Sequence, residues 1–264
     1  MRLATIQRFS NLCHLVGVPR DAVTDSWKNL CLHYSEVHRS YHTLEHIDRM
    51  LGWLESTAPG NIAIECAIWY HDVIYDPRSA RNEILSAEYF RAGIGVHLEP
   101  ALVSEVSRLI LATDHRSHRS YSHDESLLID IDLSILGGDT ELYDEYSKAI
   151  RLEYSHVPDD AYCEGRSAVL TGFLENTIFT TLPFLKLEAN ARNNILREVA
   201  ALKQQKANKA LHPTAGNAPV LIRASISAVD ELDVRFEVTT VINSIVMNIV
   251  IAQFTRVNAS ERLD

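Results

Sequence analysis

The chain has 264 residues, of which 46% are hydrophobic, and its ten glycines and eight prolines are too few for a loop-rich β protein. Its formal net charge of -10 argues against binding to long nucleic acid, because such surfaces need a basic stripe that replaces the counterions of the phosphates. A small phosphorylated substrate is compatible with this charge, since a bound metal and a few arginines can reverse the potential locally.

Apolar residues recur at three- and four-residue spacing from Leu3 to about Leu202, and turns that contain glycine or proline separate these helical segments. This pattern predicts an all-α bundle of about nine or ten helices within residues 1–205. A side-chain oxygen just before a helix can accept the unpaired amides of the first turn. The expected N-caps of this kind are Asp21 or Thr24, Thr43, Asp139 and Asp159.

The first expected helix with polar groups of chemical interest runs through residues 41–54. His42 and His46 are four residues apart and therefore share one face of that helix. Its apolar positions form a stripe that is typical of a buried face, and His46 falls beside the stripe. We expect His46 to point into the protein.

Two further segments place charged groups in apolar surroundings. His71 and Asp72 interrupt the apolar residues 67–75, and Asp132 interrupts residues 127–136. Each carboxylate would cost several kcal/mol if it were buried without a partner. A buried arginine or a His–Asp hydrogen bond would explain the burial of one such charged group. A shared cation would be a partner for both carboxylates and the histidines at once. Two imidazoles and two carboxylates suit a divalent transition metal (Mn, Fe, Co, Zn or Mg), with His46, His71, Asp72 and Asp132 as ligands.

The order His, His-Asp, Asp on successive helices resembles the HD superfamily of metal-dependent phosphohydrolases. The segment Tyr41-His42-Thr43-x-x-His46 also resembles the Tyr-His-Asn-x-x-His segment of cyclic-nucleotide phosphodiesterases, in which the second histidine binds metal and the first protonates the leaving group. This resemblance implies that His46 is the first ligand, that His42 is a general acid, and that Asp132 rather than Asp130 is the last ligand. Thr43 stands where those phosphodiesterases have asparagine.

A closer resemblance covers about residues 34–202 and is to bacterial proteins described as predicted metal-dependent HD phosphohydrolases. It implies an HD-domain-like helical bundle and an enzyme that cleaves a small phosphate ester, a nucleotide or related metabolite, with metal-activated water. The matching stretches include Tyr75-Asp76-Pro77, Asn82-Glu83-x-x-Ser86-Ala87, Ile110-x-x-Thr113-x-His115, Ile150-Arg151-x-Glu153-Tyr154, Gly165-Arg166 and Glu188-x-x-Ala191-Arg192-x-Asn194.

Further residues are expected around such a centre. Asp76, four residues after Asp72, could orient water or act as an acid, or could cap a turn before Pro77. Guanidinium donors match phosphate oxygens in pairs, so the strongest candidate for a phosphate contact is Arg151. Arg78, His115 and Tyr154 are further candidates for substrate binding, and Asn82, Glu83 and Asp130 for hydrogen bonds that support the ligands.

Two other functions fit the same residues. A di-iron oxygenase on the same scaffold would need extra histidines, such as His115, to hold a second ion. A nucleotide-binding regulatory module would keep the site but turn over little substrate. The presence of all four expected ligands argues against the regulatory module.

The remaining features concern the ends of the chain and its cysteines. Residues 206–264 lose the helical pattern, and we expect a poorly ordered tail or a small β appendage there. The N-terminus lacks a secretory pattern and the longest apolar run is too short to span a bilayer, which favours a cytoplasmic protein without a membrane partner. The sequence also allows a homo-oligomer.

The cysteines have no C-x-x-C spacing and are expected to be reduced core residues: Cys13, Cys31, Cys66 and Cys163.

Overall fold

The computed structural model describes residues 2–116 and 120–211. Within these ranges the regular structure consists of ten α-helices and three short 3₁₀ helices, and no strand occurs, which confirms the all-α prediction. The helices are α1 (Arg2–Leu15), α2 (Arg20–His33), α3 (Leu44–Thr57), α4 (Ile62–Tyr70), α5 (Asn82–Ala92), η1 (Ile94–His97), α6 (Pro100–Ala112), α7 (His123–Leu133), η2 (Ser134–Gly137), α8 (Thr140–Glu153), α9 (Asp159–Leu174), η3 (Leu185–Leu187) and α10 (Glu188–Leu211).

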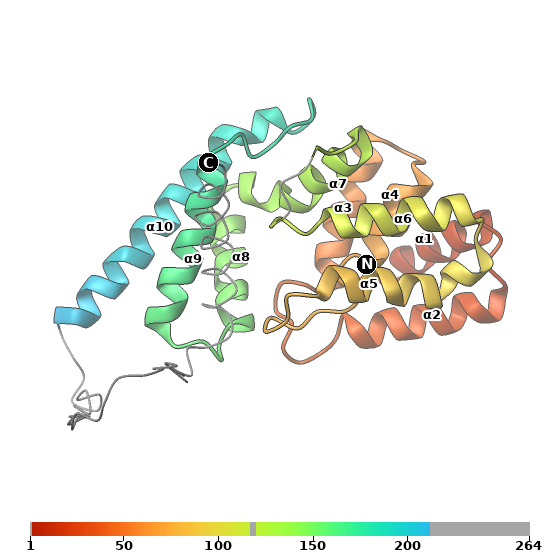
Figure 1. The fold of residues 1–264 in the computed structure, drawn as a ribbon, viewed down its shortest axis with the longest axis horizontal. Coiled ribbons are helices and arrows are strands. Elements are labelled where there is room, and N and C mark those ends of the chain that lie inside the picture. The colour runs from red at the N-terminus through yellow and green to blue at the C-terminus, as the bar shows by residue number, and fades with distance from the viewer. Residues whose placement is uncertain (1, 117–119, 212–264) are drawn as a thin grey trace, which may run out of the picture.

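Figure 1 shows two groups of helices, with α1 to α6 on one side and α8 to α10 side by side on the other. Helix α4 lies at the centre of the first group, where it packs against α1, α3, α5, α6 and α7. This position explains its composition, because a helix that is surrounded on all sides is apolar all round. Seven of its nine residues are buried, including Trp69 and Tyr70.

The short helix η2 joins the two groups. It follows α7 directly and packs against α7, α8 and α10. The backbone of η2 comes close to Leu187 at Gly137, where an added Cβ would lie 2.5 Å from the Cβ of Leu187. Any larger residue at this position would force η2 and Leu187 apart, five residues after Asp132.

The expected N-caps are correct at two of the four places. The Thr43 side chain accepts a hydrogen bond at the start of α3, and the Asp139 side chain does so at the start of α8. The expected caps of α2 and α9 are wrong, because these helices begin after Pro19 and Pro158. Proline presets the backbone angle of the residue before the first turn, and no side-chain cap forms there.

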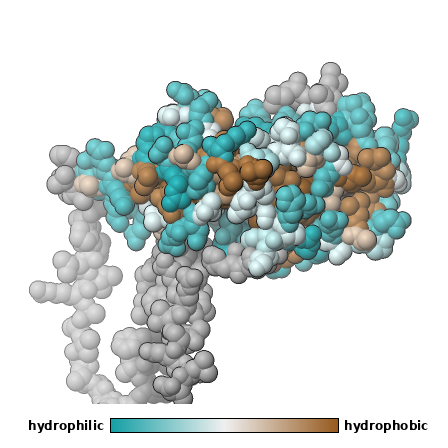
Figure 2. Space-filling model, turned by 90° about the horizontal axis from the view of Figure 1, so that it is seen from above, coloured by the Kyte–Doolittle hydropathy of each residue, from teal (hydrophilic) through white to brown (hydrophobic). Residues whose placement is uncertain are grey.

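The chain continues as α10 past Gln205 to Leu211, so the helical part extends beyond its expected end. The expected tail lies almost entirely outside the described residues. Cys13, Cys66 and Cys163 are buried thiols, and Cys31 is partly exposed. Among the described residues no helix has the length and apolarity needed to cross a membrane. The face in Figure 2 carries separate apolar patches between polar groups.

Candidate metal centre

Three helices bring the expected ligands together. His46 lies on the buried face of α3, beside Ile47 and Met50. His71 is the residue that ends α4, and Asp72 follows it in the next turn. Asp132 lies in the last turn of α7. The two imidazoles are buried, and only 17% and 15% of the Asp72 and Asp132 side chains are exposed.

The donor atoms of these four side chains face one another. The Nε2 atoms of His46 and His71 are 3.3 Å apart. Oδ1 of Asp132 lies 3.2 Å from Nε2 of His46 and 3.8 Å from Nε2 of His71. Oδ2 of Asp72 lies 3.0 Å from Nε2 of His71 and 3.9 Å from Nε2 of His46. One ligand atom from each of His46, His71 and Asp132 falls within 4.8 Å of the others, so these three could hold a metal ion.

The spacing fits a metal ion. With metal–ligand distances of about 2.1 Å, neighbouring donors lie about 3.0 Å apart around an octahedral ion and about 3.4 Å apart around a tetrahedral one. The five donor separations given above run from 3.0 to 3.9 Å. A small cavity of about 80 Å³ also borders His46 and Asp132, which leaves room for water beside the donors.

The protonation pattern shows why a cation suits these groups. Nδ1 of His71 lies 3.0 Å from the carbonyl oxygen of Ile68 and donates to it, which turns Nε2 toward the centre. Burial lowers the pKa of His71, but Asp72 opposes this effect and raises the pKa to about 9. Burial lowers the pKa of His46 below its ordinary value, so this imidazole is neutral. The His71 proton therefore occupies the place where a cation would neutralise the two carboxylates.

His42 lies next to this group but is held by a different carboxylate. Its Nδ1 is 2.7 Å from Oε2 of Glu153, and its Nε2 is 4.0 Å from Oδ2 of Asp72. The ring of Tyr75 packs against the His42 ring at 4.2 Å, and the Tyr75 hydroxyl also donates to Oε2 of Glu153. His42 thus presents Nε2 to the centre without being one of the clustered donors.

Glu153 is fully buried and its other oxygen is also in use. Oε1 accepts the backbone N–H groups of Ser40, Tyr41 and His42 at 2.8, 2.7 and 3.0 Å. Burial alone would raise the pKa of Glu153, but His42 and these donors lower it to about 2. A permanently charged Glu153 raises the pKa of His42 against the opposing effect of burial.

Arg39 fixes the backbone around the centre. Its guanidinium is buried and donates to the carbonyl oxygens of His42, Asp72 and Val73 at 3.1, 2.7 and 3.0 Å. Its Nε also donates to Glu36. The segment before α3 and the turn after α4 are therefore held together by one side chain.

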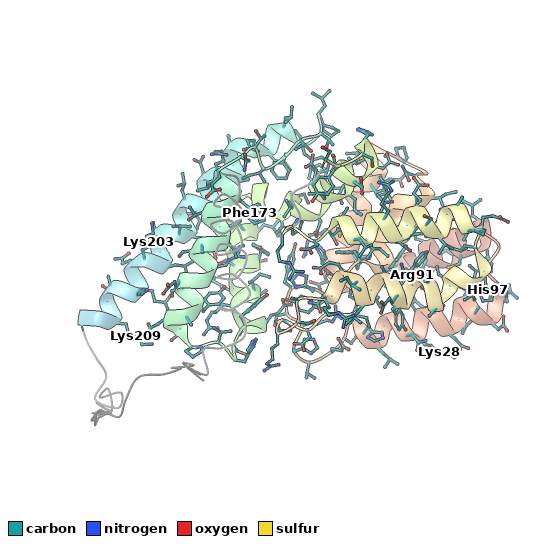
Figure 3. All side chains as sticks on the ribbon, viewed as in Figure 1. Lys28, Arg91, His97, Phe173, Lys203 and Lys209 are labelled. Carbon is teal, nitrogen blue, oxygen red and sulfur yellow. The ribbon has the colours of Figure 1, made fainter. Side chains whose placement is uncertain are left out.

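The structure brings His115 to the centre from the outer side. Its Nε2 lies 3.2 Å from Oδ2 of Asp132, the oxygen that does not face the two imidazoles. Figure 3 shows Phe173 on α9 pointing toward the first group of helices, and its ring meets the His115 ring edge-on at 6.1 Å. Burial opposes the charge of His115, but Asp132 raises its pKa above the ordinary value.

Asp76, Asn82 and Glu83 are placed in structural roles. Asp76 is exposed and its carboxylate accepts the backbone N–H of Arg78, so it caps the turn, as one of the two interpretations of the sequence expected. Asn82 bonds both backbone groups of Asp76, and Glu83 lies 3.4 Å from Arg116. Among the described residues, none of these three side chains makes a hydrogen bond with His46 or His71.

Asp130, two residues before Asp132, points in another direction. Its buried carboxylate accepts the backbone N–H groups of Thr180 and Thr181 and the Thr181 hydroxyl, at 2.6 to 3.1 Å. It therefore holds the segment between α9 and α10 against α7. The preference for Asp132 over Asp130 as the residue at the centre agrees with this geometry.

The structure does not bring Arg151 to the centre. Its guanidinium donates to the carbonyl oxygens of Tyr154 and Val157 and to Asp159, at 2.7, 3.1 and 2.7 Å. The Tyr154 carbonyl lies at the C-terminal end of α8, where the helix dipole favours a cation, and Asp159 is the first residue of α9. Tyr154 is partly buried beside the Tyr75 hydroxyl. The Arg78 side chain is exposed on the loop after α4.

Two residues that organise the centre were not predicted from the sequence. Glu153 lies 112 residues after Tyr41 in the chain, and Arg39 precedes the histidine helix without any periodic signal. A usable signal existed for Glu153, because it is a carboxylate at an apolar-facing position of α8 with Ile150 one turn before it.

No protein-family model, no curated protein and no solved structure matches this chain.

Proposed function

We propose that the chain is a metal-dependent phosphohydrolase of the HD superfamily that cleaves a small phosphate ester. The observation that carries this proposal is the convergence of two imidazoles and two carboxylates, with a fifth group, His42, positioned beside them and held by Glu153. The expected ligands are His46, His71, Asp72 and Asp132. A bound divalent cation would supply a Lewis acid that activates water at neutral pH.

His42 supports the hydrolase because of its chemistry. An imidazole that keeps Nδ1–H on a charged carboxylate presents Nε2 for proton transfer to a leaving group. Glu153 stabilises the protonated ring and holds its orientation, and Tyr75 packs on one face of the ring. Proton donation by a positioned imidazole contributes about 10² to 10⁴ in rate.

Charge and position support the proposed substrate class. A net charge of -10 disfavours polyanions, whereas the partly exposed imidazole of His115 is available to a small anion beside the metal centre. His115 has a raised pKa and carries charge more readily than an ordinary histidine. A nucleotide or related phosphorylated metabolite fits these features best.

The test is a screen of phosphorylated metabolites against the full chain reconstituted separately with Mn²⁺, Co²⁺, Mg²⁺, Zn²⁺ and Fe²⁺. Asp72→Ala is expected to lose stoichiometric metal, and His42→Ala is expected to keep metal while turnover falls about 100-fold or more. His97, labelled in Figure 3 at the far end of the first group, is exposed, and His97→Ala serves as the matched control. Metal binding without turnover of any phosphorylated metabolite would favour the regulatory module.

A second candidate is the di-iron oxygenase, which is supported by the contact of His115 with the second oxygen of Asp132. A carboxylate that faces imidazoles with both oxygens can bridge two ions. Metal analysis of aerobically purified protein separates the candidates. Two irons per chain with a charge-transfer band would contradict the simple hydrolase, and one ion without that band would contradict the oxygenase.

A further inference from the structure

A cavity of about 300 Å³ lies behind the His42 side of the candidate metal centre. Three segments line it: the one after α2, the turn after α4 and the end of α8 with the loop that follows. The lining residues are Val37, His38, Ser40, Pro77, Arg78, Leu152, Glu153, Ser155 and His156. Figure 1 shows these loops of the first group next to the lower end of α8. Its volume is at the lower limit of ordinary small-molecule sites, which hold ligands in about 300 to 1,000 Å³.

The lining carries one permanent cation, Arg78, and two imidazoles, although the chain is acidic overall. Burial and the Arg78 charge lower the pKa of His156, so this ring offers hydrogen bonds more readily than charge. The Arg78 guanidinium has no hydrogen bond or ion pair with any described residue that would use its charge. His156 also lines the cavity, and its buried Nε2 has no hydrogen-bond partner among the described residues. His38 also lines the cavity. Its Nε2 donates a hydrogen bond to the carbonyl oxygen of Tyr75 at 2.7 Å, and its other ring nitrogen remains available for a ligand.

The acidic group in the lining is already paired. Glu153 is the one carboxylate among the lining residues, and its two oxygens accept His42, Tyr75 and three backbone N–H groups. Glu36 lies 3.6 Å from His38 but is held by Arg39 at 2.9 Å. Asp76 does not line the cavity, but it is exposed, its Oδ1 accepts the backbone N–H of Arg78, and its charge acts on His156. Within the lining itself, an anion would meet the Arg78 guanidinium and no unpaired carboxylate.

The rim of the cavity is apolar and open to solvent. Val37 is fully exposed and Leu152 is 63% exposed, and both line the cavity. Exposed aliphatic side chains around a basic interior suit a ligand that has an anionic head and an apolar body.

The cavity is separate from the metal centre. The ring of His38 stacks on Tyr75 at 6.2 Å, and the ring of Tyr75 packs on His42 at 4.2 Å. The Tyr75 ring therefore stands between the cavity and the proton donor. None of the four expected metal ligands lines the cavity.

We infer that this cavity is a second, anion-binding site, which takes the phosphate or phosphonate head of a partly apolar small molecule. Arg78 and His156 bind the head, and Val37 and Leu152 contact the apolar part. The inference goes beyond the proposed hydrolysis and does not depend on it, because binding here requires no metal and no turnover.

The test is calorimetric titration of the full chain with phenylphosphonate, a non-hydrolysable probe, first with a chelator present and then after reconstitution with Mn²⁺. Saturable binding of one equivalent is expected in both conditions, and inorganic phosphate is expected to bind more weakly because it lacks the apolar part. Arg78→Gln is expected to weaken binding about tenfold or more, since it removes a charged donor. Arg91→Gln is the matched control, because Arg91, labelled in Figure 3, is an exposed arginine on α5 that does not line the cavity.

A second variant and a direct probe guard against indirect effects. Val37→Asp changes a fully exposed residue, so the fold is retained, and its negative charge is expected to weaken phenylphosphonate binding. The imidazole NMR signals of His156 are expected to shift on titration in the wild type and to stay unchanged in Arg78→Gln. Absence of saturable binding with the chelator present would overturn the inference, as would equal affinity of wild type, Arg78→Gln and Val37→Asp.

The anionic head could belong to the enzyme's own substrate or to a separate effector. If it belongs to the substrate, phenylphosphonate competes with the substrate, and Arg78→Gln raises KM. If it belongs to an effector, phenylphosphonate changes the rate at saturating substrate in the wild type and leaves the rate of Arg78→Gln unaffected. Both results support the site, and the binding measurement stands even where no substrate is found.

Discussion

Replacement of Glu153 by glutamine tests the arrangement behind His42. The substitution keeps the size of the side chain but removes its charge and replaces one acceptor oxygen by a donor. Five donors point at this carboxylate: three backbone N–H groups, Nδ1 of His42 and the Tyr75 hydroxyl. At least one of these donors faces another donor in Glu153→Gln, whichever way the amide is turned.

The magnitude follows from the pKa of the group. Lowering the pKa of Glu153 from 4.5 to about 2 is equivalent to about 3 kcal/mol of stability when the carboxylate is charged. This agrees with the loss of about 3 to 5 kcal/mol that is typical when one member of a buried ion pair is removed. We therefore expect Glu153→Gln to lower the free energy of unfolding at pH 7 by about 3 kcal/mol.

The pH dependence has a defined sign. The folded pKa is below the unfolded one, so the contribution of Glu153 is fully present above pH 4.5 and is lost as the pH falls toward about 2. The difference between wild type and Glu153→Gln should therefore shrink as the pH is lowered from 5 to 3.

The assay is urea unfolding followed by circular dichroism at pH 7, 5, 4 and 3. Glu145→Gln is the control, because Glu145 is an exposed glutamate on the same helix, and its effect should stay within about 0.5 kcal/mol. A loss below 1 kcal/mol for Glu153→Gln at pH 7, or a difference that does not change between pH 5 and pH 3, would refute the reasoning.

Three further predictions concern residues around the centre. Arg39→Lys keeps the positive charge but loses the planar set of donors to three carbonyl groups. Metal affinity, measured by competition with a chelator, should therefore fall about 10- to 100-fold. Unchanged affinity would contradict the role of Arg39. Asp130→Asn should lower the free energy of unfolding by about 2 kcal/mol or more, because it weakens the hydrogen bonds that the Thr181 N–H and hydroxyl donate to Asp130. The metal stoichiometry should stay the same. Loss of metal would show that Asp130 belongs to the centre. Arg151→Gln should lower the thermal midpoint of unfolding, because it breaks the ion pair with Asp159. Turnover of the hydrolysed ester at 25 °C should be unaffected. A selective rise in KM would show that Arg151 contacts the substrate.

The segments that converge on the candidate metal centre were predictable because burial of charge is costly. A histidine or aspartate inside an apolar helix must have a partner, and this rule marks the segments that carry His46, His71-Asp72 and Asp132. The preference for His46 over His42 and for Asp132 over Asp130 came from the family resemblance. Helical periodicity also places His46 on the inner face of its helix, and the structure has it there.

The supporting residues were not predictable in the same way. Arg151 is an arginine of the type that binds phosphate, yet it bonds carbonyl groups at the end of its own helix. Asn82 bonds the backbone of Asp76 instead of a ligand imidazole. Short-range sequence patterns describe what a side chain is able to do, and its neighbours in space determine which of these contacts it makes.

The sequence by itself determined that the chain is helical and that four polar residues need a common partner, since both conclusions depend on local spacing and on the cost of burying charge. Only the tertiary structure decided that Glu153 reaches across 111 residues to hold His42, that Arg39 ties two loops together, and that a basic cavity lies behind Tyr75. These contacts join segments whose distance in the chain carries no periodic signal. They form because the end of α8, which carries Glu153, meets the segment before α3 in space.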